Sequence, residues 1–262
     1  MQFPVEISIG HLKILLHTIV EPLAFFIGFR YFLDLRKKQG DVIESENRIW
    51  ILLGAIFGAL FGSRILGGLE NPLQLASSDN VLFYFYQNKT VLGGFLGGLA
   101  GVELIKKIIK EKNSSGDLFT YPMLPALIIG RIGCFSMGVY EETYGAPTSF
   151  PWGMHLGDNE LRHPVCLYEI IYLLLIWLLL VKLEQRYSLQ SGARFKLFMI
   201  AYCLFRFFLD FIKPHYSFKI GLSSIQLAAL AGLIYYYRYI FHPVLLIRKN
   251  EKPLAETKAG IV

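Results

Sequence analysis

The chain of 262 residues is 54% hydrophobic and only 18% charged, and its mean hydropathy is +0.45. A water-soluble domain of this size fills its core with a less apolar composition, so these values argue against a soluble protein. The net charge of +6 does not indicate nucleic-acid binding, because the basic residues follow a pattern that membrane topology explains.

Seven apolar runs come close to the length that crosses a hydrocarbon layer of ~30 Å. They cover residues 12–32, 49–66, 90–105, 119–137, 164–181, 195–211 and 222–237. The sequence therefore predicts an all-α integral membrane protein of about seven transmembrane helices, forming a single domain over residues 1–247. The basic residues 248–262 are expected to form a disordered cytoplasmic tail.

Lysine and arginine alternate between rich and poor connections along the chain. The connections at 33–48, 106–118 and 182–196, together with the region from Arg238 onward, hold 17 of these residues, whereas the other connections hold 4. Because basic residues favour the cytoplasmic side, this asymmetry predicts an external N-terminus and a cytoplasmic C-terminus. The number of helices is then odd.

Glycines recur at intervals of four in the second and third apolar runs. They are Gly54, Gly58 and Gly62 in the second run, and Gly93, Gly97 and Gly101 in the third, where Gly94 and Gly98 lie beside them. Small residues at this spacing let helix backbones approach closely in lipid. We therefore expect close helix packing here, with contact to a ligand as the alternative.

Two arginines are predicted to lie inside the membrane at the same depth. Arg131 and Arg206 each follow the inner end of a predicted helix by 12 residues, which corresponds to about 18 Å at a rise of ~1.5 Å per residue. An arginine at the centre of a membrane helix costs roughly 2.5 to 3.5 kcal/mol, so its presence suggests a function. The two arginines could share one ligand. Arg64 is expected near the outer interface.

Acidic and polar side chains are expected beside these arginines. Tyr202, Arg206 and Asp210 are spaced by four and share one helix face, and Glu169 falls in the outer half of the fifth helix. One interpretation is that the arginines merely pair with Glu169 and Asp210 inside the bundle. We favour a site for an anionic lipid. The three arginines expected in the outer half, Arg64 included, outnumber the two acidic residues, and a guanidinium group suits bidentate phosphate binding.

The longest external connection covers residues 138–163 and is dense in glycine, proline and aromatic residues. Loops that carry function are commonly folded by their own side chains. We therefore predict an ordered external cap over the site, in preference to a solvated linker.

Several stretches of the sequence resemble the prolipoprotein diacylglyceryl transferase family. They are GSR at 62–64, GGFLGGLAG at 93–101, GRIGCFSMGVY at 130–140 followed by YG, RHPVCLYE at 162–169, and YCLFRFFLDF at 202–211 followed by SSIQL. These stretches occur in the order found in the family and extend from the second predicted helix to the seventh. The resemblance implies a multi-pass protein of the bacterial inner membrane with seven helices and an external N-terminus.

The resemblance also implies a reaction. Such an enzyme moves the diacylglyceryl group of phosphatidylglycerol onto the lipobox cysteine thiol of a prolipoprotein, forms a thioether and releases glycerol phosphate. By resemblance, Arg131 and Arg206 bind the phosphate, Tyr202 and Asp210 orient Arg206, and Glu169 holds the polar network together. No metal or other cofactor is expected.

Five further residues are expected at the substrate site by resemblance. They are Arg64, Gly97, Gly98, Gly145 and Arg162. Gly145 matches a family glycine in the cap, although its distance in sequence from the arginine of the GRIGC stretch is longer than in the usual family pattern.

The chain departs from the family at two positions. Leu96 stands where well-studied members have a histidine, and Cys134 stands where asparagine is common. A histidine is the obvious base for a thiol, so the base here is unassigned. Candidate replacements are His17, Glu21 and His163, although a packed interior histidine is the simpler interpretation of His17. Cys134 is interpreted as a small packing residue rather than a nucleophile. A thiol with a pKa of ~8.5 is also partly ionised without any base.

Two other functions compete with this interpretation. A divergent paralogue would bind anionic phospholipid or transfer the lipid group to another acceptor. An anion transporter would also place arginines within the membrane, but the sequence shows neither inverted repeats nor paired broken helices.

Overall fold

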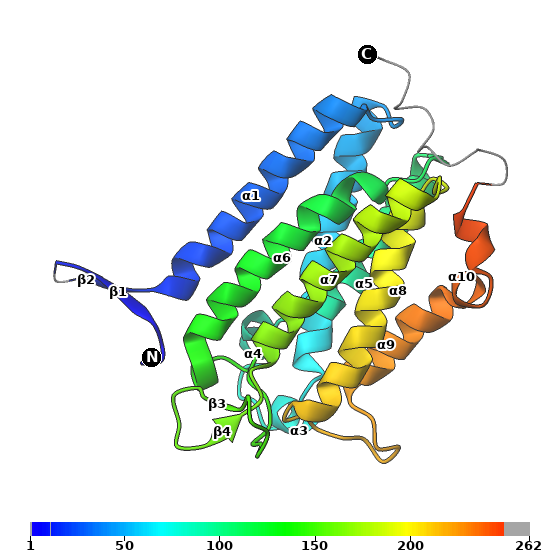
Figure 1. Cartoon of the computed structure of the whole chain (residues 1–262). Coiled ribbons are helices and arrows are strands. Elements are labelled where there is room, and N and C mark those ends of the chain that lie inside the picture. The colour runs from blue at the N-terminus through cyan, green and yellow to red at the C-terminus, as the bar shows by residue number, and fades with distance from the viewer. Residues whose placement is uncertain (1, 11, 249–262) are drawn as a thin grey trace.

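The computed structural model describes residues 2–10 and 12–248, and helices dominate this part of the chain (Figure 1). The main helices are α1 (Leu16–Gln39), α2 (Ser45–Gly68), α5 (Val91–Ile108), α6 (Asp117–Met137), α7 (Val165–Arg186), α8 (Ala193–Leu209) and α9 (Ser224–Tyr235). The expected disordered tail at 248–262 lies outside the described residues, apart from Arg248.

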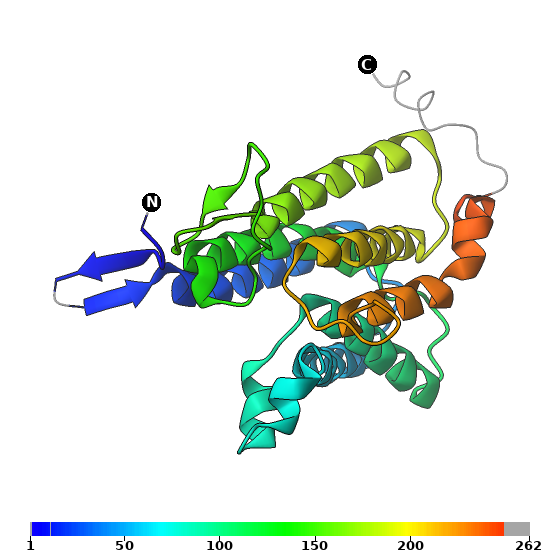
Figure 2. The ribbon, with the colours of Figure 1, turned by 90° about the horizontal axis from the view of Figure 1, so that it is seen from below.

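Pairs of antiparallel helices build the bundle. α1 packs along α6 and α2 packs along α5, while α6 also contacts α7 and α8 packs on α9 (Figures 1 and 2). The buried core lies among α6, α7, α8 and α9, where Leu124, Leu173, Phe198 and Ile225 are almost fully buried. Many large apolar side chains on α1, α2 and α7 remain exposed, as expected for surfaces that face lipid rather than water.

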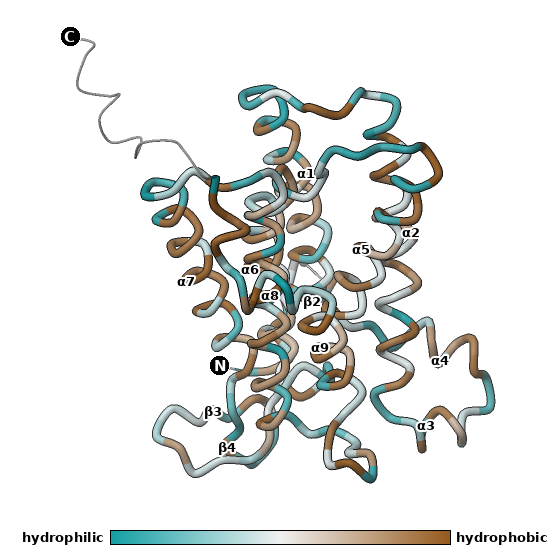
Figure 3. The backbone as a smooth tube through the Cα atoms, turned by 90° about the vertical axis from the view of Figure 1, so that its right-hand side faces the viewer, coloured by the Kyte–Doolittle hydropathy of each residue, from teal (hydrophilic) through white to brown (hydrophobic). Residues whose placement is uncertain are grey.

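Within the described residues, four helical segments are long and apolar enough to cross a membrane. They are Leu16–Gln39, Ser45–Gly68, Asp117–Tyr140 and Val165–Arg186. The prediction of a mostly helical membrane protein with several spans is therefore confirmed. Hydrophobic residues run along the helices in Figure 3, and many connecting loops are hydrophilic.

The predicted start of the first helix at residue 12 is wrong. Leu12–Leu15 forms strand β2, which pairs antiparallel with β1 (Glu6–Ile9), and α1 begins only at Leu16. Gly10 has a φ of +63°, which glycine adopts without steric cost, and this turn directs the apolar residues into a hairpin. The hairpin extends away from the helices (Figure 2).

The predicted seventh helix at 222–237 is shorter in the structure. Ser223 caps α9 in a capping box, in which its hydroxyl accepts from the backbone N–H of Gln226 and the Gln226 side chain accepts from the Ser223 N–H. The helix is interrupted at Tyr236, after which α10 (Tyr237–Phe241) and the 3-10 helix η3 (Pro243–Leu246) follow. At ~1.5 Å per residue, the 12 residues of α9 span about 18 Å.

Two short helices, α3 (Pro72–Ala76) and α4 (Val81–Gln87), lie in a connection for which the sequence analysis predicted no helix. Each follows an asparagine whose side chain caps its first turn: Asn71 accepts from the N–H of Gln74, and Asn80 accepts from the N–H of Phe83. The signals for these helices are therefore local caps rather than a long apolar run.

Residues 138–163 fold into the 3-10 helix η1 (Gly138–Tyr140) and a small hairpin of β3 (Met154–His155) and β4 (Leu161–Arg162). Backbone hydrogen bonds hold the segment together and tie it to the bundle, from Val139 N to Leu156 O at 2.9 Å and from Ala146 N to Ile212 O at 2.8 Å. This segment lies at the end of the bundle where α6 ends and α7 begins (Figure 1).

The glycine-rich faces of α2 and α5 are in direct contact. A Cβ atom added to Gly62 would lie 2.7 Å from the Cα of Gly97, and one added to Gly58 would lie 3.0 Å from the carbonyl carbon of Gly97. A Cβ on Gly98 would meet Ala59 at an ordinary 3.6 Å. The expected close packing is confirmed, and it places Gly97 and Gly98 against α2.

Candidate anion site at the buried arginines

Arg131 on α6 and Arg206 on α8 reach the same carboxylate oxygen on α7. Arg131 Nε lies 2.9 Å, and Arg206 Nη1 3.4 Å, from Oε2 of Glu169. All three side chains are at least nine-tenths buried, with exposures of 9%, 6% and 2%. The predicted match in depth is therefore confirmed, because two arginines far apart in the sequence converge on one group.

Tyr202 completes this network from one helical turn before Arg206. Its hydroxyl donates a hydrogen bond of 2.7 Å to Oε1 of Glu169, so both oxygens of that carboxylate are engaged. The Tyr202 ring is fully buried and packs edge-on against Phe95 at 5.0 Å between centroids. Tyr202 thus acts on the arginines through Glu169, which it holds in place.

The arginine cluster has more hydrogen-bond donors than its carboxylate can satisfy. Nε of Arg206 is buried and has no hydrogen-bond partner among the described residues. Asp210, predicted to orient Arg206, accepts a hydrogen bond from the hydroxyl of Ser223 at the start of α9. A buried N–H without an acceptor costs roughly 1–3 kcal/mol, so this donor is a natural place for an anionic oxygen.

The cluster continues from Arg131 toward the segment 138–163. Arg131 Nη1 lies 3.8 Å from Sγ of Cys134. A cavity of about 10 Å³ lies beside Cys134, and its walls include Thr143 and Cys166. Such a space holds roughly one water molecule. A lipid headgroup therefore requires the covering segment or the helix ends to move.

Arg64 and Arg162, both predicted at the substrate site, are engaged elsewhere. Arg64 donates to the backbone carbonyl of Tyr86 and lies over its ring. Arg162 binds Asp158 at 2.7 Å and Glu160 at 2.8 Å, and its hydrogen bond keeps the pKa of Asp158 below its ordinary value. The contacts of Arg162 therefore lie within the segment 138–163.

Gly145 is held in the same segment by close packing. Its N–H donates to the carbonyl oxygen of His163, and an added Cβ would lie 2.6 Å from the Cβ of His163 and 3.0 Å from Cγ1 of Val165. Only a residue without a side chain fits this contact. The packing of residues 138–163 against the start of α7 thus accounts for a glycine at position 145.

The candidate bases differ in their surroundings. His163 Nδ1 is hydrogen-bonded to the hydroxyl of Tyr168 at 3.1 Å. Leu96, at the position of the family histidine, packs against the hydrophobic core near Gly232 of α9 and offers no base.

His17 faces two carboxylates, since its Nε2 lies 3.3 Å from Glu21 and its Nδ1 lies 3.5 Å from Glu141. The sequence analysis missed Glu141, because it belongs to an irregular segment without a periodic signal.

A third buried arginine was not among the predicted site residues. Arg48 on α2 is 1% exposed and binds both oxygens of Asp41, at 2.7 Å for Nε, while its Nη1 donates to the carbonyl of Ser115 at 3.1 Å. Its guanidinium lies 5.6 Å from the centre of the Phe119 ring. Arg48 lies near the start of α2, at the end of one of the connections rich in lysine and arginine, and that pattern does not indicate burial.

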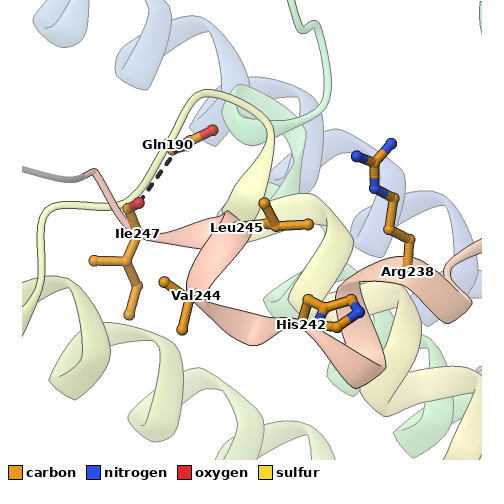
Figure 4. A pocket seen from close by; sticks show the side chains of 6 residues that line it. All are labelled: Gln190, Arg238, His242, Val244, Leu245 and Ile247. Carbon is orange, nitrogen blue, oxygen red and sulfur yellow. Dashed lines mark hydrogen bonds between the residues drawn. The ribbon is translucent and has the colours of Figure 1, made fainter.

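A larger cavity of about 440 Å³ lies at the far end of the bundle (Figure 4). It is lined by Gln190, Arg238, His242, Val244, Leu245 and Ile247. Three of its six lining residues are aliphatic, and Gln190 Nε2 donates to the carbonyl of Ile247 at 3.4 Å. The cavity is formed by the chain that follows α7 and α9, whereas the arginine cluster lies near the opposite ends of α6, α7 and α8.

The fold and the buried cluster together define a class of protein, a membrane protein with several helical spans and a polar arginine site within its bundle. Comparison with known proteins identifies the family. The model of the prolipoprotein diacylglyceryl transferase family matches residues 4–241. The chain therefore belongs to the prolipoprotein diacylglyceryl transferase family and is an enzyme of that transferase family, as the resemblance predicted.

Individual relatives agree with this assignment. The chain is 30% identical over 243 residues to the phosphatidylglycerol–prolipoprotein diacylglyceryl transferase of Cupriavidus metallidurans, which covers 86% of this chain and 85% of that protein. It is 32% identical to the enzyme of the same name from Nitrosomonas europaea, over 94% of both chains. The similarity thus extends over nearly the whole length of these relatives.

Proposed function

We propose that the chain transfers the sn-1,2-diacylglyceryl group of phosphatidylglycerol to the lipobox cysteine thiol of a bacterial prolipoprotein. The products are a thioether and glycerol phosphate. Family membership supports the reaction, and one structural observation supports its location. Arg131 and Arg206 share a single carboxylate, while Nε of Arg206 is buried and has no hydrogen-bond partner within residues 2–10 and 12–248.

The arginine cluster suits the chemistry of the leaving group. The thiolate attacks a primary glyceryl carbon, and the bond from that carbon to the phosphate oxygen breaks. Negative charge grows on the departing phosphate, and preorganised N–H donors in a site of low polarity lower the barrier to this step. We assign Arg131 and Arg206 to the phosphate, Tyr202 to the support of Glu169, and Glu169 to the positioning of both guanidinium groups.

The remaining predicted residues support this site in other ways. Gly145 and Arg162 maintain the fold of residues 138–163, which we propose to be the external cap. Gly97 and Gly98 keep α5 against α2. Arg64 is bound to the carbonyl of Tyr86 near the end of α2, and we propose that it meets the headgroup only by exchanging this contact. The residues 1–247 then act as one membrane domain.

We also propose seven membrane helices, with the N-terminus outside and the C-terminus in the cytoplasm of a bacterial inner-membrane protein. The basic residues Arg36, Lys37 and Lys38 lie in the last turn of α1, and Lys106 and Lys107 lie in the last turn of α5, at the end of the bundle opposite residues 138–163 (Figure 1). The positive-inside rule assigns that end to the cytoplasm. The arginine cluster then lies in the outer half of the bundle, on the side where a prolipoprotein arrives.

One observation favours a second function. Leu96 occupies an apolar position instead of the family histidine, which suits a paralogue that binds anionic phospholipid but uses another acceptor. The anion-transporter alternative gains no support from the arrangement of the helices.

Mass spectrometry of a lipobox peptide, incubated with the purified protein and phosphatidylglycerol, tests the proposal. We expect the peptide to gain a diacylglyceryl group as glycerol phosphate appears in equal amount, and a peptide with serine in place of cysteine to remain unchanged. If phosphatidylglycerol binds but neither product forms, the paralogue interpretation replaces this one.

A further inference from the structure

Three reactive side chains meet beside the arginine cluster. They come from distant parts of the chain: His17 from the start of α1, Cys134 from α6, and Glu141 from the segment after η1. Their nitrogen, sulfur and oxygen atoms all lie within 4.8 Å of one another. Since Arg131 Nη1 is 3.8 Å from Sγ of Cys134, this group is continuous with the site proposed for the phosphate.

The contact between His17 and Glu141 is not a hydrogen bond in the structure. Nδ1 of His17 and Oε2 of Glu141 face one another at 3.5 Å, and both atoms are buried without a hydrogen-bond partner among the described residues. A neutral imidazole carries one N–H, and its Nε2 side faces Glu21 at 3.3 Å. With that N–H directed to Glu21, the opposite face presents two acceptors and no donor, an arrangement that gains a hydrogen bond when a proton arrives.

The fold keeps the imidazole in this position. Gly133 of α6 leaves room for the ring, because a Cβ added there would lie 3.2 Å from Nδ1 of His17. Glu21 is itself fixed by Lys89, whose ammonium lies 2.7 Å from its other oxygen. The charged and titratable groups around His17 are therefore Glu21 and Lys89 on one side, and Glu141 and Cys134 on the other, with the arginine cluster beyond Cys134.

We propose that His17, supported by Glu141, is the base that takes the proton from the incoming lipobox thiol. This inference rests on the proposed function. It supplies a base in a chain that has Leu96 where the family has a histidine. The S–H bond breaks and its proton moves to Nδ1 of His17, where the imidazolium lies between two carboxylates. The sulfur lone pair forms the bond to the glyceryl carbon, the carbon–oxygen bond breaks, and its electron pair leaves with the phosphate.

The proton then has a route out of the site. Glu141 keeps 22% of its side chain exposed, so it can pass the proton from the imidazolium to water after glycerol phosphate has left. His163 does not offer this function, because its Nδ1 is already bound to Tyr168. Cys134 remains a neighbour of the reaction, since the thiol that is modified belongs to the substrate.

The same three side-chain types also bind zinc in proteins. The neighbourhood argues for proton transfer instead, because Arg131 places a permanent positive charge beside the cysteine sulfur, where it would oppose a metal cation. Zinc binding is therefore an outcome that the experiment must separate from the proposal.

A pair of acceptor peptides tests the assignment. One lipobox peptide carries cysteine and the other selenocysteine, whose selenol is already ionised at neutral pH and needs no base. For His17→Gln we expect the rate with the cysteine peptide at pH 7 to fall by about 100-fold or more, with kcat affected more than KM. The selenocysteine peptide should react within a few-fold of the wild-type rate, and the cysteine peptide should recover as the pH approaches its thiol pKa of ~8.5.

Two further variants serve as a second test and as a control. Glu141→Gln should show the same pattern with a smaller loss, and His155→Gln, which changes an exposed histidine of the same segment, should react as the wild type does. Phosphatidylglycerol-dependent thermal stabilisation of each variant checks that the lipid site is intact.

The possible outcomes are distinct. Equal losses with both peptides, despite intact lipid binding, would overturn the assignment of His17 as a base. Activity that a chelator abolishes and zinc restores would overturn it in favour of a metal site. No transfer by the wild-type protein to either peptide would refute the proposed function itself, and the base with it.

Discussion

The chain holds two sites with buried arginines at opposite ends of its bundle, and they differ in how completely the guanidinium groups are satisfied. Arg48 is bound by both oxygens of Asp41 and by the carbonyl of Ser115. Arg131 and Arg206 divide one carboxylate between them, and Arg206 keeps a buried N–H without a partner in the part of the chain that the structure describes. Burial of an arginine is therefore common to both sites, whereas an unsatisfied donor is found at one.

This difference distinguishes an arginine that stabilises the fold from a pair of arginines that can bind a ligand. A saturated arginine such as Arg48 holds the connection between α1 and α2 against the start of α6, and it has little left to offer a ligand. The cluster around Glu169 keeps binding capacity that the protein itself does not use. Each of the following predictions tests one side of this comparison.

The largest effect is expected from the unsatisfied cluster. Arg131→Gln and Arg206→Gln should each lower diacylglyceryl transfer by about 100-fold to 1,000-fold, because each removes a charged donor to the leaving phosphate. Peptide product measured by mass spectrometry gives the rate, and the thermal midpoint of each variant provides the control for folding. Transfer near the wild-type rate in either variant would refute the phosphate assignment.

Arg48→Gln should show the opposite pattern. Removing one partner of a buried ion pair costs about 3 to 5 kcal/mol, because the other charge is left uncompensated. We therefore expect a clear fall in the thermal midpoint in detergent, with the transfer rate per folded molecule unchanged. A stable but inactive Arg48→Gln protein would remove the distinction between the two sites.

Tyr202→Phe should have a moderate effect. It removes the hydroxyl that donates to Glu169 at 2.7 Å and leaves both arginines in place. A hydrogen bond to a charged group contributes about 1.5 kcal/mol, which corresponds to a roughly tenfold lower kcat if the bond acts by holding Glu169. A change confined to KM would instead place the hydroxyl in substrate binding.

The smallest effect concerns the pH dependence of the saturated site. Burial alone would raise the pKa of Asp41, but hydrogen bonds from Arg48 and from the N–H of Ile43, with the charges of Arg48 and Arg36, hold that pKa below its ordinary value. Since the folded pKa lies below the unfolded one, the stabilisation is present above about pH 4 and is lost as the pH falls through the folded pKa. Asp41→Asn should flatten the fall of the thermal midpoint on acidification, whereas an unchanged slope would show that other groups cause it.

The sequence predicted the positions of the main helices because their length and apolar composition are direct consequences of crossing a bilayer. It also predicted that Arg131 and Arg206 converge, since depth along a helix follows from residue counting. The helix boundaries were less accurate, because they depend on local features such as the Gly10 turn and the capping box at Ser223.

The partners within the site were harder to predict. The sequence offered Glu169 and Asp210 as partners of the arginines, but that Glu169 alone binds both depends on how α7 is rotated toward α6 and α8, which hydropathy does not determine. The position of Glu141 beside His17 depends on the fold of an irregular segment. The burial of Arg48 also gave no signal, because its partner Asp41 lies in a short connection rather than at helical spacing.

The most direct test of the central claim is lipid binding by variants of the two arginine sites. Thermal unfolding with increasing phosphatidylglycerol should raise the midpoint of the wild type and of Arg48→Gln, since a ligand that binds the folded state stabilises it. Arg206→Gln should show little shift, and phosphatidylethanolamine should give little shift with any of the three proteins. An equal shift in Arg206→Gln and the wild type would contradict the claim that the unsatisfied arginine cluster binds the lipid phosphate.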